Sequence, residues 1–474
     1  MLIFNTLSQK KEEFKPLKNN VVSFYQCGPT VYWAQHIGNM RAMIMGDLAR
    51  RALTYLGYNV NYVRNYTDVG HLVSDEDEGE DKMEKGARRE GLTPDEIANK
   101  YIAQFEHDTN ALNILEPTQK PRATETIPEI IEMVKILIDK GFAYETPLAV
   151  YFDISKVKNY SALSGQDLSK QESGARAGHV TDSEKKNIQD FAVWFFKAGE
   201  HKNALQTWES PFHSTLADKG QGFPGWHMEC SAMSKKFLGE TIDIHMGGVE
   251  HMSIHHTNEI AQSESANGKP FVNYWMHNEH LFVDGKKMAK SEGTGFTLDE
   301  VTSKGFSPED LRYFFLQAHY RSKQNFTWEA LGASANGLKK INEKIVTLNK
   351  KADIPNLLDT ECLTFIESFR GAVADDFNSP QALAVLQDVL KLDLNDSDKL
   401  TIILDFDKVL GLSFGKIASE SPAEIPSEII ALAKERELAR QNKDWQKSDE
   451  LRDKIEGLGY SVQDNEKGYL VTKK

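Results

Sequence analysis

The 474-residue chain contains only three cysteines, Cys27, Cys230 and Cys362. A set this small and odd in number excludes a disulfide framework and is typical of a protein in a reducing compartment. The sequence has no apolar run of about 18 residues, the length of a membrane span, and its first apolar run is too short for a signal peptide. These absences predict a cytoplasmic protein without membrane contacts.

Basic residues are in the minority, with 56 Lys and Arg against 70 Asp and Glu and a net charge of −14. This balance excludes a surface that coats nucleic acid throughout, but it is compatible with a local basic surface. Residues 431–474 hold 10 basic and 9 acidic residues, so the other residues carry about −15 and this tail is relatively basic. The length predicts three or more packed units.

Residues near the N-terminus predict a strand, a helix and a second strand. The strands are the apolar runs 21–27 and 59–66. Between them apolar residues recur at four-residue spacing, and Gly57 can end the helix in a left-handed conformation. This order makes a βαβ unit of a parallel sheet. Ligands of such sheets bind beyond the carboxyl ends of the strands, where Cys27 and residues 36–39 lie.

A second helix is predicted to begin with a capping box of Thr126 and Glu129 and to end at Gly141. We read residues 116–215 as an insertion into the sheet domain. Further along, the sequence predicts strand-like runs at 149–154 and 191–196, a turn at 284–285, helices from about 305 and a Ser/Pro-rich linker at 419–427.

Four residues spread over half of the chain have the chemistry of a zinc site. Two thiolates, from Cys27 and Cys230, join an imidazole and a carboxylate, from His255 and Glu259. The last two are four apart, so on a helix they share a face, from which the adjacent His256 is expected to point away. The alternative is a polar surface helix with unrelated histidines.

The segment HIGN at 36–39 lies between a predicted strand and a predicted helix. A helix N-terminus suits phosphate through its dipole and its unbonded backbone N–H groups. Gly38 permits close approach of a nucleotide, and His36 can donate to a phosphate oxygen. The alternative is an ordinary histidine near a helix start.

The segment KMAKS at 287–291 is flanked by glycines. Its lysines, Lys287 and Lys290, can close over a triphosphate and offset the charge that develops in a transition state. The alternative is a lysine pair on a surface loop, which is common in proteins.

Class I cysteinyl-tRNA synthetases are the family that these motifs resemble. The resemblance covers nearly the whole chain, in FNTLSQKKEEFKPL, YQCGPTVY, HIGN, PGWHMECSAMS, DIHMGG, HHTNEIAQS, NYWMH, KMAKS, DDFNSPQALAVL and the tail KDWQKSDELRDKIEGLGYSVQD. It implies an α/β fold with a Rossmann-like parallel-sheet catalytic domain (1–115 and 216–275), a connective insertion (116–215), a stem-contact segment with a KMSKS-type loop (276–330), a helical bundle (331–418) and a small anticodon-recognition domain (425–474).

The resemblance also implies the site. One zinc ion would bind Cys27, Cys230, His255 and Glu259. ATP and Mg²⁺ would lie against His36, Gly38, Asn39, His245, Gly247, Gly248, Glu250, Lys287 and Lys290, of which His36, Asn39, Lys287 and Lys290 would be catalytic. Gly28, Thr67 and Trp226 would adjoin the amino acid.

The implied activity is ATP-dependent formation of cysteinyl-adenylate from L-cysteine, followed by transfer to the 3′ end of tRNA(Cys), by a monomer. Zinc would select the thiol, because a hydrophobic pocket separates near-isosteres by only ~1–3 kcal/mol. The sequence departs from the family at three positions. Ala289 inside KMAKS stands where serine is usual, and Glu250 and Trp33 stand where aspartate is common.

Three alternatives remain open at this point. They are a cysteine-activating ligase that acts on a small amine, a non-catalytic tRNA-binding paralogue and a zinc hydrolase. The C-terminal residues disfavour the first, and the retained His36, Lys287 and Lys290 disfavour the second. The sequence contains no HExxH motif, which disfavours the third.

Overall fold

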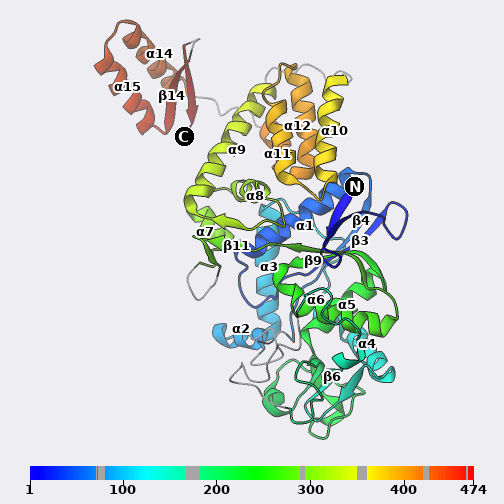
Figure 1. Ribbon diagram of the computed structural model, residues 1–474. Coiled ribbons are helices and arrows are strands. Elements are labelled where there is room, and N and C mark those ends of the chain that lie inside the picture. Colours follow the sequence, from blue (N-terminus) through cyan, green and yellow to red (C-terminus); the bar gives the residue numbers. More distant parts are fainter. Residues whose placement is uncertain are drawn as a thin grey trace.

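The computed structural model describes residues 1–70, 72, 81–166, 182–288, 294–349, 360–419, 426–465 and 468–473. In Figure 1 a central sheet region lies between a bundle of long helices on one side and a smaller β-rich region on the other. A C-terminal unit lies beyond the bundle. Among the described residues, no helix combines the length and the apolar composition needed to cross a membrane.

The central sheet is parallel and has the strand order β10-β9-β3-β4. Its strands are β3 (Val21–Gln26), β4 (Asn59–Arg64), β9 (Ile242–Gly248) and β10 (Val272–Asn278). Helix α1 (Ile37–Tyr55) connects β3 to β4, which confirms the predicted βαβ unit and the α/β class. Gly57 follows the helix with φ +99°, a conformation that L side chains rarely adopt.

The strand order places a topological switch point between β3 and β9. From β3 the chain moves outward to β4, whereas from β9 it moves in the opposite direction to β10 through helix α6 (His255–Asn267). Connections that leave neighbouring strands in opposite directions open a crevice beyond their carboxyl ends. The residues after β3 and β9 therefore lie where a ligand of this sheet binds.

The inserted region contains an antiparallel sheet with the order β5-β6-β7-β8. Its strands are β5 (Ala143–Glu145), β6 (Ala149–Phe152), β7 (Phe191–Phe196) and β8 (Gly222–Pro224). The two strand-like runs predicted from the sequence form β6 and β7. The last strand comes from beyond residue 215, where the sequence analysis ended the insertion.

Helix α5 (Trp226–Leu238) contacts strands of both sheets, and α4 (Ile127–Asp139) packs on it. Helix α2 (Lys82–Glu90) packs on α3 (Pro94–Ala111). The predicted capping box of α4 is wrong. Thr126 ends a short 3₁₀ turn, Ala123–Thr126, and its hydroxyl donates to the carbonyl of Ala123 at 3.0 Å. The turn satisfies that hydroxyl locally and leaves it unavailable as a cap. Gly141 follows the helix with φ +76°, as expected.

The turn predicted at 284–285 joins β11 (Leu281–Val283) to β12 (Lys286–Lys287). Asp284 and Gly285 have φ +49° and +76°, the positive values of a tight hairpin turn. On its other edge β11 pairs in parallel with β13 (Gln324–Phe326). The short helices α7 (Leu298–Ser303) and α8 (Pro308–Leu316) lie between.

The bundle consists of α9 (Trp328–Asn349), α10 (Thr360–Ala374), α11 (Ser379–Val389), α12 (Asp396–Leu410) and α13 (Phe414–Ser419). One hydrophobic core runs from the central sheet into these helices. Buried charges join the parts: Asp47 of α1 accepts from Arg312 of α8 at 2.6 Å, and Arg312 also donates to the carbonyl of Leu410 in α12 at 2.7 Å. Arg312 therefore links the bundle to α1.

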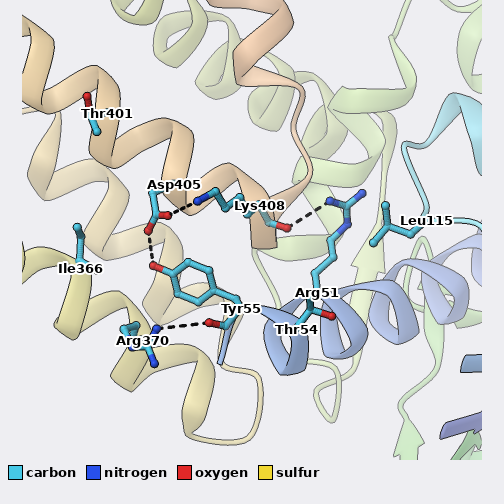
Figure 2. A pocket seen from close by; sticks show the side chains of 9 residues that line it. All are labelled: Arg51, Thr54, Tyr55, Leu115, Ile366, Arg370, Thr401, Asp405 and Lys408. Carbon is cyan, nitrogen blue, oxygen red and sulfur yellow. Dashed lines mark hydrogen bonds and ion pairs between the residues drawn. The ribbon is translucent and has the colours of Figure 1, made fainter. Parts of the chain in front are cut away.

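A cavity of about 620 Å³ lies where α1 meets α10 and α12 (Figure 2). Arg370 donates to the carbonyl of Tyr55, the last residue of α1, and Arg51 donates to the carbonyl of Lys408, near the end of α12. Cations near helix C-termini offset the negative end of the helix dipole. The side chains of Tyr55 and Lys408 both bind Asp405. These polar groups thus hold three helices together.

The N-terminal strand β1 (Leu2–Asn5), which pairs with β2 (Lys10–Glu13), is also tied to the bundle. Buried Asp376 accepts hydrogen bonds from the Phe4 N–H at 2.9 Å and from the Tyr320 hydroxyl at 2.7 Å. Arg321 pairs with the same carboxylate at 2.7 Å. One carboxylate therefore joins three segments that are far apart in sequence.

The C-terminal unit consists of α14 (Ser427–Gln441), α15 (Trp445–Gly457) and the hairpin β14 (Tyr460–Asn465) and β15 (Gly468–Lys473). It has its own small apolar core, which includes Ile429, Ala433 and Ile455. Buried Arg436 forms a bidentate pair with Asp464, at 2.7 and 3.0 Å. The interactions that hold this unit together lie within it.

Candidate active site

Cys27 lies at the carboxyl end of β3, where its N–H donates to the carbonyl of Met246 in β9 at 3.1 Å. The next residue, Gly28, passes so close to β4 that a Cβ there would lie 1.6 Å from the carbonyl oxygen of Asn65. Its N–H donates to the Asn65 side chain at 2.9 Å. Only glycine allows this approach, which fixes the loop that carries Cys27.

The four residues predicted to bind zinc meet at this edge of the sheet. One ligand atom from each of Cys27, Cys230, His255 and Glu259 lies within 4.8 Å of all the others, and all four side chains are buried. Cys230 comes from α5, whereas His255 and Glu259 come from α6, with 3.1 Å between the His255 Nε2 and a Glu259 oxygen. Two thiols, an imidazole and a carboxylate are suitable ligands for a transition metal.

A second set of ligand atoms overlaps the first: Cys27, His245, His256 and Glu259. The Cys27 Sγ lies 3.3 Å from the His256 Nε2, so the expectation that His256 points away from the cluster is wrong. His256 and Glu259 are three apart, a spacing that also places side chains on one helical face. Helix phase alone therefore did not separate the two histidines.

His245, predicted on the adenosine side, lies in β9 with its side chain fully buried in this cluster. Its Nε2 lies 3.0 Å from a Glu259 oxygen, and its ring stacks on Trp275 at 4.7 Å between centroids. Burial lowers the pKa of His245 to about 3, which keeps the imidazole neutral at physiological pH. This neutral ring can donate to Glu259 and orient its carboxylate.

The cluster contains strongly desolvated acids. Burial raises the pKa of the Cys27 thiol and of the Glu259 carboxyl well above their usual values. Among the described residues, the Glu259 oxygen that lies near the His255 Nε2 accepts no hydrogen bond. Buried anions are stable only when paired or bound to a metal. The donor set, its burial and this oxygen together fit a bound metal ion.

Sequence reasoning missed several histidines around the cluster. The His277 Nε2 lies 2.7 Å from the His256 Nδ1, and the His277 Nδ1 lies 2.9 Å from the Thr6 hydroxyl. The His227 Nδ1 lies 3.0 Å from the His255 Nδ1. Their signal was their place in NYWMH, at the end of β10, and in GWHMEC beside Cys230. Such contacts fix the orientation of the inner rings.

The residues predicted near the amino acid lie around this cluster. Trp226 begins α5, and its ring centroid is 4.0 Å from that of His255. Thr67 follows β4, and its hydroxyl accepts from the Asn65 side chain at 3.2 Å. Because the Asn65 side chain also accepts from the Gly28 N–H, Gly28 and Thr67 are held together beside Cys27.

HIGN lies at the N-terminus of α1, as predicted. The His36 Nδ1 accepts from the Asn39 N–H at 3.2 Å, and the Asn39 side chain accepts from the His36 N–H at 3.3 Å, so the two residues cap the helix reciprocally. A Cβ at Gly38 would lie 3.4 Å from the Met288 sulfur. The Ile37 N–H donates to the Phe296 carbonyl at 2.7 Å. Met288 of the KMAKS segment and Phe296 beyond it therefore both lie against the start of α1.

For the other residues predicted to bind ATP, Lys290 excepted, the structure gives the position but does not test the role. Lys287 contributes its backbone to β12, and Lys290 lies outside the described residues. Gly247 and Gly248 are buried at the end of β9. The Glu250 side chain is half exposed and lies 3.6 Å from the His280 Nδ1. The roles assigned to these residues stay predictions.

Two solved structures share this fold. Mycobacterium tuberculosis methionyl-tRNA synthetase in complex with methionyl-adenylate aligns with a TM-score of 0.57 over 84% of this chain and 93% of that chain, at 13% identity. The ternary complex of Agrobacterium radiobacter K84 agnB2 LeuRS with tRNA and LeuAMS aligns with a TM-score of 0.60 over 86% and 87%, at 10% identity. The fold is that of a class I aminoacyl-tRNA synthetase.

Sequence comparisons narrow this class. Residues 13–336 match the tRNA synthetases class I (C) catalytic domain, and residues 423–469 match the cysteinyl-tRNA ligase anticodon binding domain. The cysteine--tRNA ligase of Treponema denticola is 41% identical over 98% of this chain and 97% of that relative, and that of Chlorobaculum tepidum is 41% identical over 100% and 99%. The chain belongs to the cysteine–tRNA ligase family, which confirms the resemblance seen in the motifs.

Proposed function

We propose that the protein activates L-cysteine with ATP and transfers it to the 3′ end of tRNA(Cys). The observation that carries this proposal is the buried Cys/His/Glu cluster at the switch point, in a chain that matches both the catalytic and the anticodon-binding parts of the family. The cluster is suited to sulfur recognition, and Cys27 reaches it from the end of β3, the strand that precedes α1.

Cys27, Cys230, His255 and Glu259 would hold one zinc ion, with His245 and His256 orienting Glu259 and Cys27 from behind. Zinc held there supplies a preference for a thiolate over an alcohol and so discriminates cysteine from serine. A purely apolar pocket would separate the two by only ~1–3 kcal/mol. Gly28, Thr67 and Trp226 would enclose the rest of the amino acid.

In the first step the cysteine carboxylate attacks the α-phosphorus of ATP, the bond to the bridging oxygen breaks, and pyrophosphate leaves. The chain positions the reactants and stabilises charge. His36 and Asn39 fix the N-terminus of α1, whose dipole favours phosphate. Lys287 and Lys290 would offset charge on the leaving pyrophosphate, Mg²⁺ would accompany the nucleotide, and Gly247, Gly248 and Glu250 would border the adenosine.

In the second step a ribose hydroxyl of the terminal adenosine of tRNA attacks the adenylate carbonyl, and AMP leaves. Residues 276–330 would contact the tRNA stem, and 425–474 would read the anticodon. Trp445 supports the latter role, because it is 57% exposed and the Arg440 guanidinium lies 5.7 Å from its ring. Exposed aromatic and arginine side chains stack on unpaired bases. We assign this work to a cytoplasmic monomer.

The test combines three measurements on the purified protein. Cysteine should support ATP–pyrophosphate exchange at least about 100-fold better than serine, about one zinc ion per chain should copurify, and tRNA(Cys) should be charged. Faithful selection of cysteine by a metal-free protein would overturn the zinc assignment. Exchange without any charging of tRNA(Cys) would overturn the second step and favour a ligase that acts on another acceptor.

A further inference from the structure

Glu229 is a buried acid for which the fold supplies no hydrogen-bond donor. It lies in α5 next to Cys230 and is 0% exposed, and neither of its carboxyl oxygens has a hydrogen-bond partner among the described residues. The Thr67 hydroxyl is a neighbour of this carboxyl but does not meet the geometry of a hydrogen bond. A buried polar group in this state is costly to stability, so its presence calls for a partner that the folded chain does not supply.

Two other acids near Glu229 have donors of their own. The Asp68 carboxylate accepts from the Thr124 N–H at 3.0 Å and from the Thr124 hydroxyl at 2.7 Å. Asp81 caps α2, where it accepts from the Met83 N–H at 2.6 Å. Glu229 also belongs to neither set of metal-ligand atoms that the described residues form. Neither a structural hydrogen bond nor the metal-binding cluster therefore accounts for Glu229.

The position of Glu229 places its carboxyl beside the predicted binding site of the amino acid. Glu229 and Cys230 are three and four residues after Trp226, so on α5 both lie one turn beyond that ring. A Cβ at Gly70 would lie 3.1 Å from a Glu229 oxygen, so the carboxyl faces the loop after β4 that also carries Thr67. Glu229 thus adjoins residues assigned to the metal and residues assigned to the amino acid.

Cysteine itself carries the donor that the fold lacks. Its α-ammonium group has three N–H donors, and only two carbon atoms separate the nitrogen from the sulfur. A substrate whose sulfur lies at the metal-binding cluster therefore has its ammonium group near the first turns of α5.

Extending the proposed function, on which this step rests, we infer that Glu229, with the Thr67 hydroxyl beside it, accepts hydrogen bonds from the α-ammonium group of cysteine. Hydrogen bonds from a charged donor are stronger than neutral ones, and exclusion of water strengthens them further. Glu229 then makes a free α-amino group a requirement for binding, in addition to the thiol that the cluster recognises.

The experiment compares three thiols by calorimetry, which needs no turnover. They are L-cysteine, cysteamine, which keeps the ammonium group but lacks the carboxylate, and 3-mercaptopropionate, which keeps the carboxylate but lacks the ammonium group. Glu229→Gln should raise the Kd of cysteine and of cysteamine about 10- to 100-fold, because Gln offers one acceptor oxygen and no charge. It should not raise the Kd of 3-mercaptopropionate.

Glu129→Gln is the matched control. Glu129 of α4 also contacts α5, but it pairs there with Lys236 at 2.6 Å and so has a cation of its own. This variant should leave all three Kd values unchanged, and zinc content and thermal midpoint are measured for both variants. Equal loss of affinity for all three thiols in Glu229→Gln, or no loss for any of them, would overturn the inference.

Wild-type protein provides a test that does not depend on the folding of a variant. It should bind cysteine at least about 10-fold more tightly than 3-mercaptopropionate, and equal affinities would also overturn the inference. If wild type binds cysteine but supports no ATP–pyrophosphate exchange, the proposed function fails, and the Kd values still decide whether Glu229 binds the ammonium group.

Discussion

The metal-binding cluster at the carboxyl ends of the central strands and the C-terminal unit differ in which residues they bury. At the sheet edge, thiols, imidazoles and carboxyls are buried together, and most of their partners are one another. In the C-terminal unit the buried residues are mainly apolar, and the buried charge of Arg436 is paired in a bidentate manner with Asp464. Buried polar groups without compensation are costly in stability, so their concentration marks the first region as a site of chemistry.

The comparison suggests a division of labour. Discrimination between sulfur and oxygen needs a dry, ordered cluster, whereas reading bases needs an exposed surface such as that of Trp445. The bundle belongs with the first region, because a shared core and hydrogen bonds from Arg51 and Arg312 to carbonyls of α12 join it to the central sheet region. We therefore expect amino-acid activation and tRNA recognition to be separable by mutation.

The largest expected effect is that of Cys230→Ser. Replacement of one sulfur ligand should reduce bound zinc and lower cysteine-dependent pyrophosphate exchange at least about 1,000-fold, since about 4 kcal/mol of binding to the reacting complex is lost. Metal analysis and exchange kinetics measure both quantities. Cys362→Ser is the control, because Cys362 is buried in α10, far along the chain from the cluster, and should retain zinc. Full zinc content and normal cysteine affinity in Cys230→Ser would contradict the ligand assignment.

Much of the catalytic region could be predicted from the sequence, for a physical reason. The strands, α1 and the turn at 284–285 follow from local periodicity and turn chemistry, and the ligand types follow from coordination chemistry. Ligand chemistry suggested that Cys27 and Cys230 share a site and the family resemblance supported it, whereas local patterns did not show that they meet, because contacts between distant segments depend on topology. Such dependence also explains why His277, which reaches His256 from β10, was not predicted.

The errors have the same origin. His256 faces the cluster because a three-residue spacing serves the same helical face as a four-residue one, and local phase does not separate them. Thr126 does not cap α4 because an unpredicted 3₁₀ turn already uses its hydroxyl. Lys290 lies outside the described residues, so its role is still a prediction.

The second prediction tests whether the bundle belongs with the catalytic region. Asp376→Asn weakens the link between β1, the segment of Tyr320 and Arg321, and the bundle, and should lower the free energy of unfolding of the catalytic part by about 2–4 kcal/mol. Thermal and chemical denaturation measure it. Asp375→Asn is the control, because its pair with Lys11 is exposed and should contribute at most about 1 kcal/mol. Equal effects of the two variants would contradict a buried joint.

The third prediction tests the separation of the C-terminal unit. Deletion of residues 426–474 should leave cysteine-dependent pyrophosphate exchange within about twofold of wild type, because the unit has its own core. Charging of tRNA(Cys) should fall about 100-fold in kcat/KM, which corresponds to about 2.7 kcal/mol of lost tRNA contacts. Parallel initial-rate assays measure both activities. Equal losses in the two assays would show that the regions do not act separately.

The smallest expected effect concerns pH, for which the two regions should respond with opposite sign. Burial, with a contribution from Asp299, raises the pKa of Asp108 in α3 to about 6, whereas the hydrogen bond from Arg436 lowers the pKa of Asp464. A carboxyl whose pKa is raised by folding binds its proton more tightly in the folded state. As the pH rises from about 4 to about 6, such a carboxyl loses its proton more readily in the unfolded state, so the folded state becomes less stable. A carboxyl with a lowered pKa contributes stability that is lost as pH falls below its unfolded value.

Asp108→Asn should therefore stabilise the catalytic part by about 1–2 kcal/mol at pH 7.5, after allowance for solvent near the carboxyl, and by nothing near about pH 4. Asp464→Asn should destabilise the C-terminal unit at neutral pH, with a smaller effect in acid. Denaturation monitored from pH 4 to 7.5 measures both, with exposed Asp95→Asn on α3 as the control. A gain for Asp108→Asn that is the same at every pH would show that the carboxyl is not held at a raised pKa, and the contrast in charge burial between the two regions would then rest on the metal-binding cluster alone.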